Sequence, residues 1–284
     1  MITAKAGTFA DLVKWEHTIF ALPFAYVGAF LGARGLPTAA QAFWILIAMI
    51  GGRTAAMALN RLIDWAIDAR NPRTVGRHLP RGLMSTMEVL AFTAASLGLL
   101  ILAAYKLNPL CVKFLPLVVP VLVFYSYTKR FTWACHFWLG LSYVFVPFGG
   151  WIAVTGWLEL APVVLGIAAG LWVAGFDVIY ATQDMEFDRR EGLHSIPARF
   201  GLAAALRIAR AIHLVVVALL LILGLWLKLG YVYLVGAAIV AALLHYEHAI
   251  ISPRDMSRLN AAFFNVIGYI SIVFFLFTAA AVVS

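Results

Sequence analysis

The sequence predicts an all-α integral membrane protein with nine transmembrane helices. Three observations lead to this fold class: 64% of the 284 residues are hydrophobic, only 12% are charged, and the mean hydropathy is +0.94. Soluble domains contain roughly 45–50% apolar and 25% charged residues. The composition therefore excludes a soluble enzyme, a disordered chain and a disulfide-stapled secreted domain. We expect a single transmembrane domain over residues 1–284.

Nine apolar stretches are close to the length of about 20 residues that a helix needs to cross a bilayer. They lie at residues 18–36, 39–63, 86–105, 108–128, 132–155, 160–183, 202–228, 230–248 and 260–283. Residues 1–17 form an amphipathic lead-in without the cleavage site of a signal peptide. Cys111 and Cys135 stand alone, so neither a disulfide nor a cysteine metal site is expected.

The basic residues predict the orientation of these spans. Of the 21 Lys and Arg residues, 16 fall on one side of the predicted bundle and four on the other. Because Lys and Arg accumulate in cytoplasmic loops, the first side is cytoplasmic, which places the N-terminus inside and the C-terminus outside. We therefore attribute the net charge of +8 to the basic cytoplasmic loops of a membrane protein. No nucleic-acid partner is expected. The two longest cytoplasmic segments, 64–85 and 184–201, also carry six of the 13 acids.

Two acidic motifs end the second and the sixth predicted spans. Asn60, Asp64 and Asp68 are four residues apart, so they share one face of a helix. Asp184 and Asp188 have the same spacing, and Asp184 follows Asp64 by 120 residues. The loops after both motifs contain a His, a Pro and an Arg. Either a duplicated half or a chance similarity accounts for the likeness of these two segments. Membrane proteins built from internal repeats tend to place their functional site at the interface of the repeats.

Carboxylates one helical turn apart at a membrane boundary are unfavourable, because like charges destabilise the helix and the bilayer disfavours charge. A bound divalent cation removes both penalties. Mg²⁺ takes few protein carboxylates together with waters and substrate phosphates. The two motifs therefore predict Mg²⁺ ions that clamp a diphosphate, while nearby Arg and Lys balance the remaining charge. A single motif of this kind is more often a solvated helix end, but two copies at matching positions favour the metal site.

The motifs resemble those of the UbiA superfamily of intramembrane aromatic prenyltransferases. The similarity includes NPRT (71–74), YSYTKR (125–130), DRREGLHSIPARFG (188–201), EHTIFALPFA (16–25) and WIAVTG (151–156). It is strongest to bacterial members of the 4-hydroxybenzoate polyprenyltransferase type. Two positions differ from the family pattern: Arg61 stands where many members have an acid, and the second motif has Glu186 where some relatives have a further aspartate.

The resemblance implies a nine-helix bundle around a central chamber with lateral access from the lipid bilayer. The Mg²⁺ ligands that it implies are Asn60, Asp64, Asp68, Asp184 and Asp188. Lys129 and Arg130 would support the polyprenyl diphosphate, with Tyr127 nearby. The implied reaction ionises the allylic C–O bond, after which an aromatic ring attacks the cation. The residues expected to act in this step are Asp64, Asp68, Asp184, Asp188 and Lys129.

Further charged residues are candidates for binding substrate. Asp177 lies about two turns inside the sixth span, where acids are usually functional, and a buried pair with Arg53 is the alternative. Arg53 is also a candidate for the carboxylate of an aromatic acceptor. Arg77 and Arg199 lie in the loops after the motifs, where they would meet a diphosphate or serve only as cytoplasmic loop charge.

Two histidines near the end of the eighth span, His245 and His248, do not form an HExxH motif. Two histidines alone make a poor metal site. We expect them to be interfacial side chains.

The predicted function is Mg²⁺-dependent transfer of a polyprenyl group to an aromatic acid of the 4-hydroxybenzoate type, in respiratory quinone synthesis. A dihydroxynaphthoate of menaquinone synthesis remains open as acceptor, because it uses the same mechanism. A secondary transporter is the alternative of another class, although the acids cluster at span ends and not at mid-depth. The expected partners are the diphosphate, the acceptor and the lipid bilayer. The expected location is a bacterial-type inner membrane, with the active site facing the cytoplasm.

Overall fold

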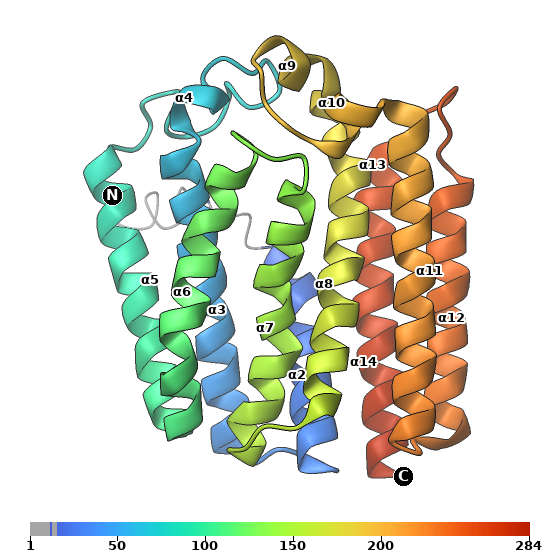
Figure 1. The fold of residues 1–284 in the computed structure, drawn as a ribbon. Coiled ribbons are helices and arrows are strands. Elements are labelled where there is room, and N and C mark those ends of the chain that lie inside the picture. The colour runs from blue at the N-terminus through green and yellow to red at the C-terminus, as the bar shows by residue number, and fades with distance from the viewer. Residues whose placement is uncertain (1–11, 13–15) are drawn as a thin grey trace.

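The computed structural model describes Leu12 and residues 16–284. Figure 1 shows long helices that run side by side between two ends of a bundle. The long helices are α2 (Glu16–Ala33), α3 (Ala39–Ile63), α5 (Thr86–Leu107), α6 (Pro109–Thr128), α7 (Cys135–Thr155), α8 (Leu160–Tyr180), α11 (Leu202–Trp226), α12 (Gly230–Ala249) and α14 (Ile267–Val283). Short helices join them: α4 (Trp65–Asp68), η1 (Ala181–Asp184), α9 (Met185–Arg190), α10 (Ile196–Phe200), α13 (Leu259–Ala261) and η2 (Ala262–Val266).

The all-α prediction is confirmed for the described residues. Seven of their helices, beginning at α3 and ending at α12, are long and apolar enough to cross a membrane. Shorter apolar helices, Phe20–Ala33 and Ile267–Val283, occupy the positions of the first and ninth predicted spans. The count of nine spans therefore stays a prediction. Most of the lead-in predicted for residues 1–17 lies outside the described residues.

Local sequence signals set several helix starts. Thr38 begins α3 with a capping box, in which its hydroxyl accepts from Gln41 N and the Gln41 side chain accepts from Thr38 N. Ser85 and Glu88 form the same arrangement at the start of α5. Each box satisfies backbone N–H groups that have no partner inside the helix. These two helices begin within one residue of the predicted positions.

Close packing of α7 against α8 depends on small residues. A Cβ atom at Gly140 would lie 2.4 Å from the Gly170 carbonyl oxygen, and one at Gly170 would lie 2.7 Å from the Gly140 carbonyl oxygen. Both positions are thus limited to glycine by the approach of the two backbones. Trp172 and Leu165 of α8 are buried in the main core, with residues of α2, α11, α12 and α14.

Both acidic motifs lie where a long helix is interrupted, yet Asn60, Asp64 and Asp68 still line the same cavity, as their spacing predicts. Asp64 follows the last residue of α3 and precedes α4, with φ −93° and ψ 5°. Asp184 precedes α9 with nearly the same conformation, φ −99° and ψ 2°. Helical backbone hydrogen bonds continue through this turn, from Asp64 N to the Asn60 carbonyl and from Asp68 N to the Asp64 carbonyl. The duplicated half stays a prediction.

The histidines at the end of α12 differ from expectation. His245 is exposed, as an interfacial side chain would be. His248, however, is only 6% exposed, and its neighbour Glu247 is 1% exposed. The prediction of interfacial side chains is wrong for His248, because its ring turns inward to His213 of α11.

Candidate active site

A polar cavity of about 970 Å³ includes residues of α4 and of the η1 segment before α9 in its lining, and Figure 1 shows α4 and α9 at the same end of the bundle. Helices α3, α6, α7 and α8 and the loop after α4 contribute its wall. The sequence-predicted residues that line it are Arg53, Asn60, Asp64, Asp68, Arg77, Lys129, Asp177 and Asp184. The fold thus brings the two acidic motifs to one cavity.

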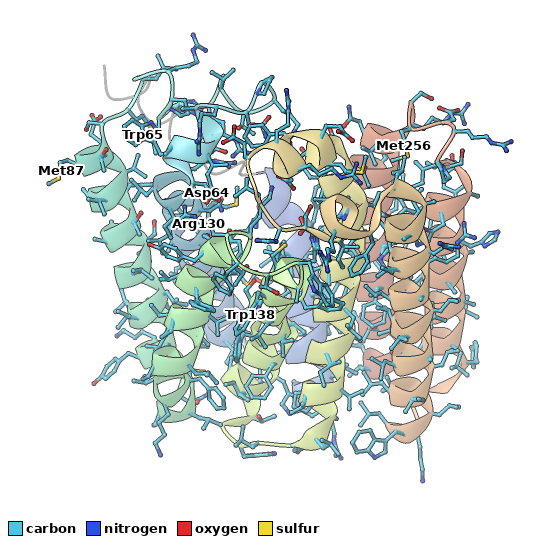
Figure 2. The ribbon with its side chains drawn as sticks, turned by 45° about the horizontal axis from the view of Figure 1, so that its top comes forward. Asp64, Trp65, Met87, Arg130, Trp138 and Met256 are labelled. Carbon is cyan, nitrogen blue, oxygen red and sulfur yellow. The ribbon has the colours of Figure 1, made fainter. Side chains whose placement is uncertain are left out.

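Asp64 of the first motif is held by α3 and α6. Its Oδ2 accepts a hydrogen bond from Asn60 Nδ2 at 2.7 Å, and Asn60 also approaches the Ser126 hydroxyl at 3.3 Å. Arg130 Nη2 lies 3.3 Å from Asp64 Oδ1 and also donates to the Ile63 carbonyl. Figure 2 shows Asp64 and Arg130 near each other at this end of the bundle. The guanidinium of Arg130 lies over the Tyr127 ring, 5.0 Å from its centroid.

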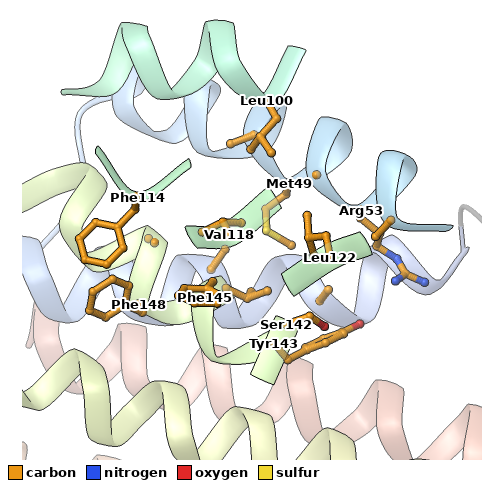
Figure 3. A pocket seen from close by; sticks show the side chains of 18 of the residues that line it. Met49, Arg53, Leu100, Phe114, Val118, Leu122, Ser142, Tyr143, Phe145 and Phe148 are labelled. Carbon is orange, nitrogen blue, oxygen red and sulfur yellow. The ribbon is translucent and has the colours of Figure 1, made fainter. Parts of the chain in front are cut away.

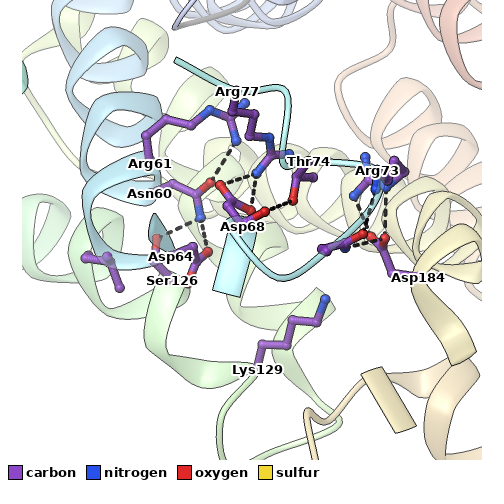
Figure 4. Close-up of polar contacts among 12 residues, drawn as sticks. Asn60, Arg61, Asp64, Asp68, Arg73, Thr74, Arg77, Ser126, Lys129 and Asp184 are labelled. Atoms are coloured by element: carbon purple, nitrogen blue, oxygen red, sulfur yellow. Dashed lines mark hydrogen bonds and ion pairs between the residues drawn. The ribbon is translucent and has the colours of Figure 1, made fainter. Parts of the chain in front are cut away.

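Asp184 of the second motif is held by the loop that follows the first motif. Arg73 binds both carboxylate oxygens, through Nε at 2.8 Å and through Nη2. Asn71 Nδ2 donates to Oδ1 at 2.9 Å, and the Arg73 guanidinium lies over the ring of Tyr180. Figure 4 shows this grouping beside that of the first motif. The bidentate geometry is the strong form of an Arg–carboxylate pair.

The second aspartate of each motif is buried and also paired. Asp68 accepts from Arg77 Nη1, which lies 2.6 Å from each carboxylate oxygen. Asp188 is fully buried; Lys129 Nζ lies 2.8 Å from its Oδ1, and the Ser195 hydroxyl donates to its Oδ2. Asp188 is not among the residues that line the cavity. It contacts the site through Lys129.

Two consecutive cations after α6 link the motifs. Lys129 pairs with Asp188 of the second motif, and Arg130 pairs with Asp64 of the first. The Lys129 carbonyl also accepts from His194 N at 2.7 Å, which fixes this loop against the chain after α9. The basic pair therefore bridges Asp64 and Asp188, which are 124 residues apart in sequence.

Charge is unevenly balanced around the cavity. Burial, with the nearby Asp68 carboxylate, raises the pKa of Asp64 to about 6. For Lys129, burial alone would lower the pKa, but the Asp188 carboxylate outweighs it and the net shift is upward. Lys129 thus stays a cation, while Asp64 lacks full compensation for its negative charge.

Asp177 pairs with His136, a residue that the sequence analysis missed. The two side chains approach to 2.7 Å between Oδ2 and Nδ1. Because the backbone N–H of Ile196 donates to His136 Nε2, the ring proton is on Nδ1 and points to Asp177. The alternative pairing of Asp177 with Arg53 is thus replaced by a histidine of α7. No spacing in the sequence linked His136 to Asp177.

Arg53 lies where the polar cavity meets a smaller apolar cavity of about 190 Å³. Figure 3 shows Arg53 at one end of the apolar cavity and Phe114 and Phe148 at the other. The two cavities share lining residues, among them Arg53 and Tyr125. Arg53 Nε is buried and has no hydrogen-bond partner among the described residues. A buried donor without a partner is costly, so this position suits an anionic ligand group.

The potential metal-ligand atoms around the polar cavity suit Mg²⁺. They are carboxylate and amide oxygens, which Mg²⁺ prefers, and the cavity has room for the waters and phosphates that complete its shell. Within the described residues, however, the motif carboxylates do not form a group of three with ligand atoms inside 4.8 Å. Each one is paired with a basic side chain instead.

Some predicted residues lie away from the cavity, and others were not predicted. Arg199 is exposed and does not line it. Tyr127 contacts Arg130 but is also absent from the lining. Asn71 and Arg73 belong to the NPRT segment, and their position directly after the first motif was the signal that could have placed them in the site.

Comparison with known proteins gives a consistent result. Residues 21–279 match the UbiA prenyltransferase family. A 4-hydroxybenzoate octaprenyltransferase of Vibrio atlanticus (strain LGP32) is 27% identical over 272 residues, which cover 93% of this chain and 94% of that protein. The enzyme of the same name from Vibrio cholerae serotype O1 (strain M66-2) is 29% identical over 271 residues, with 93% and 94% covered.

Solved structures show the same fold. The apo structure of a UbiA homolog from Aeropyrum pernix K1 superposes with a TM-score of 0.84 and 37% identity, covering 91% of this chain and 95% of that one. A UbiA homolog from Archaeoglobus fulgidus, bound to GPP and Mg²⁺, has a TM-score of 0.74 and 20% identity, covering 97% and 99%.

Proposed function

Because the chain belongs to the UbiA prenyltransferase family, we propose that it transfers a polyprenyl group from polyprenyl diphosphate to the ring of an aromatic acid of the 4-hydroxybenzoate type. The product would enter respiratory quinone synthesis. The observation that carries the proposal is the meeting of two acidic motifs at one polar cavity that adjoins an apolar one. The names of the Vibrio relatives support the choice of acceptor.

The proposed metal ligands are the polar side chains of the two motifs. We expect them to hold Mg²⁺, and the Archaeoglobus homolog of similar fold was solved with this ion. The proposed set is Asn60, Asp64, Asp68 and Asp184, which line the cavity, together with Asp188, which would have to exchange its pair with Lys129 for the metal. When bound, Mg²⁺ would supply positive charge to the diphosphate as it becomes a leaving group.

The basic side chains have two roles in this proposal. In the protein alone they form ion pairs with the motif carboxylates. In the substrate complex they would donate to the phosphate oxygens, which develop charge as the allylic C–O bond breaks. Arg73 and Arg130 can donate through several N–H groups, and Lys129 is held at the centre by its pair with Asp188. Arg77, in the loop after α4, would also donate to the phosphate oxygens.

The apolar cavity would protect the allylic cation from water, which would otherwise capture it. Arg53, at the junction of the cavities, is the proposed partner of the acceptor carboxylate, since its Nε is buried without a protein partner. Asp177, held by His136, forms a polar wall beside it. We expect Arg53→Gln to raise the KM for the acceptor about 10-fold and to leave diphosphate binding unchanged.

The proposed location is a bacterial inner membrane, with the cavity facing the cytoplasm. The distribution of basic residues supports this side, and so does the chemistry, since a charged diphosphate would arrive from the aqueous phase. The C-terminus lies at the opposite end of the bundle from α4 and α9 (Figure 1).

The test is a prenylation assay with purified protein, one polyprenyl diphosphate, Mg²⁺ and three acceptors. The acceptors are 4-hydroxybenzoate, 1,4-dihydroxy-2-naphthoate and 1,4-dihydroxy-6-naphthoate. We expect product with 4-hydroxybenzoate only, and none after EDTA. Product with a naphthoate instead would reassign the acceptor. Absence of diphosphate binding would overturn the proposal and favour a transporter.

A further inference from the structure

We propose that α11 and α12 hold a divalent transition-metal ion of the zinc type between His213, Glu247 and His248. The prenyl-transfer site uses none of these residues, so this proposal is independent of that function. His213 comes from the middle of α11, and the other two come from the last turn of α12. Ionisable residues inside a membrane bundle are costly and are usually functional.

The distances between the potential ligand atoms match one ion. His213 Nδ1 lies 2.9 Å from His248 Nε2 and 3.4 Å from Glu247 Oε2. The three ligand atoms are all within 4.8 Å of one another. Ligands bound tetrahedrally to zinc at about 2.0–2.1 Å lie about 3.3 Å from each other. The cluster is therefore close to the spacing that a tetrahedral ion requires.

The tautomer of His213 also suits a metal ligand. Its Nε2 lies 3.3 Å from the Trp172 carbonyl oxygen, which can only accept, so Nε2 carries the proton. The lone pair on Nδ1 then faces Glu247 and His248. Metal-binding histidines commonly donate their other ring N–H to a carbonyl in this way.

The ring of His213 has room because residue 175 is glycine. A Cβ atom at Gly175 would lie 2.3 Å from His213 Nε2. The missing side chain lets the ring rest on the backbone of α8 and reach Trp172. Trp172 also lines the polar cavity, so the cluster lies directly behind the cavity wall.

The cluster is deeply buried, and its carboxyl group lacks hydrogen-bond donors. The exposed fractions of His213, Glu247 and His248 are 2%, 1% and 6%. Neither carboxylate oxygen of Glu247 has a hydrogen-bond partner among the described residues. An isolated buried carboxylate costs several kcal/mol, and here it faces the lone pair of a neutral ring. A cation at the centre satisfies all three groups.

The ligand types select the metal. Two imidazoles and one carboxylate suit Zn²⁺, Co²⁺ or Fe²⁺, whereas Mg²⁺ prefers oxygen ligands only. We therefore expect the histidine cluster to bind zinc and to reject magnesium. Because the ligands join α11 to α12 and the Trp172 contact joins them to α8, the ion would cross-link this side of the bundle.

Metal analysis of the untagged full-length protein in detergent tests the proposal. We expect about one zinc per chain after purification without chelator. We also expect the metal-free protein to develop the visible absorption of tetrahedral Co²⁺ on titration with that ion. Glu247→Gln and His248→Gln should lose both signals. His245→Gln, an exposed histidine on the same helix, is the matched control and should retain them.

A second control separates this site from the aspartate motifs. Asp64→Asn should keep the zinc, because Asp64 lies in the other site. Loss of zinc in that variant, but not in His248→Gln, would contradict the proposal. Should the cluster variants fail to fold, the wild-type Co²⁺ spectrum decides: absence of a tetrahedral band would mean that the cluster binds no metal ion and would overturn the proposal.

Discussion

The two acidic motifs share a backbone conformation but differ in how their first aspartates are held. Asp184 is 5% exposed and receives bidentate hydrogen bonds from Arg73 and another from Asn71. Asp64 is half-buried and has one amide donor and a single Arg130 contact at 3.3 Å. The second motif is therefore fully paired in the protein alone, whereas the first motif keeps an incompletely balanced charge. This difference indicates that the first motif gains more from a bound cation.

The largest expected effect is on catalysis, and there we expect substitutions in the two motifs to have equal effects. Asp64→Asn and Asp184→Asn should each reduce turnover on the order of 10²–10³-fold, because each removes a charge that would face the diphosphate through the metal. The measurement is single-turnover prenylation at saturating Mg²⁺. Near-normal rates in either variant would remove that aspartate from the proposed site.

Thermal unfolding of Arg73→Gln tests the strong pairing of the second motif. The substitution leaves the Asp184 carboxylate buried with only Asn71 as partner, so we expect a loss of about 3 kcal/mol of stability. The measurement is the shift in Tm in detergent without metal. Wild-type stability in this variant would mean that Arg73 and Asp184 do not hold each other.

Asp64→Asn should have the opposite effect on the stability of the metal-free protein. The pKa of Asp64 is raised to about 6, so its ionisation at pH 7.5 opposes folding. Asparagine keeps the contact with Asn60 without the charge, and we expect a gain of about 2 kcal/mol. The penalty exists above pH 6 and is lost as the pH falls toward about 4, where Asp64 is protonated in both states. The gain should therefore vanish near pH 4 in a series of unfolding curves, and a gain that is independent of pH would contradict this origin.

Arg130→Gln should change stability least. Its side chain is 36% exposed and contacts Asp64 at 3.3 Å, and such pairs contribute about 1 kcal/mol or less. Unfolding of Arg130→Gln beside Arg73→Gln, under the same conditions, measures the asymmetry of the two motifs directly. Equal shifts would show that the motifs are held equally.

The sequence by itself determined the class of the protein, the approximate bounds of its helices and the identity of both acidic motifs. These properties are local: hydropathy, capping residues such as Thr38 and Ser85, and spacing along a helix can be read from neighbouring residues. Asn60 and Asp64 are four residues apart, and their hydrogen bond follows from that spacing.

Only the tertiary structure decided which side chains pair across the bundle. Asp184 meets Arg73, 111 residues away; Asp177 meets His136; and His213 meets Glu247 and His248. The interruption of the helix at Asp64 belongs here too, since the spacing of the motif does not show where the helix is interrupted. Such pairings depend on the packing and rotation of helices, and a single apolar stretch carries no record of which neighbour its polar residues will face.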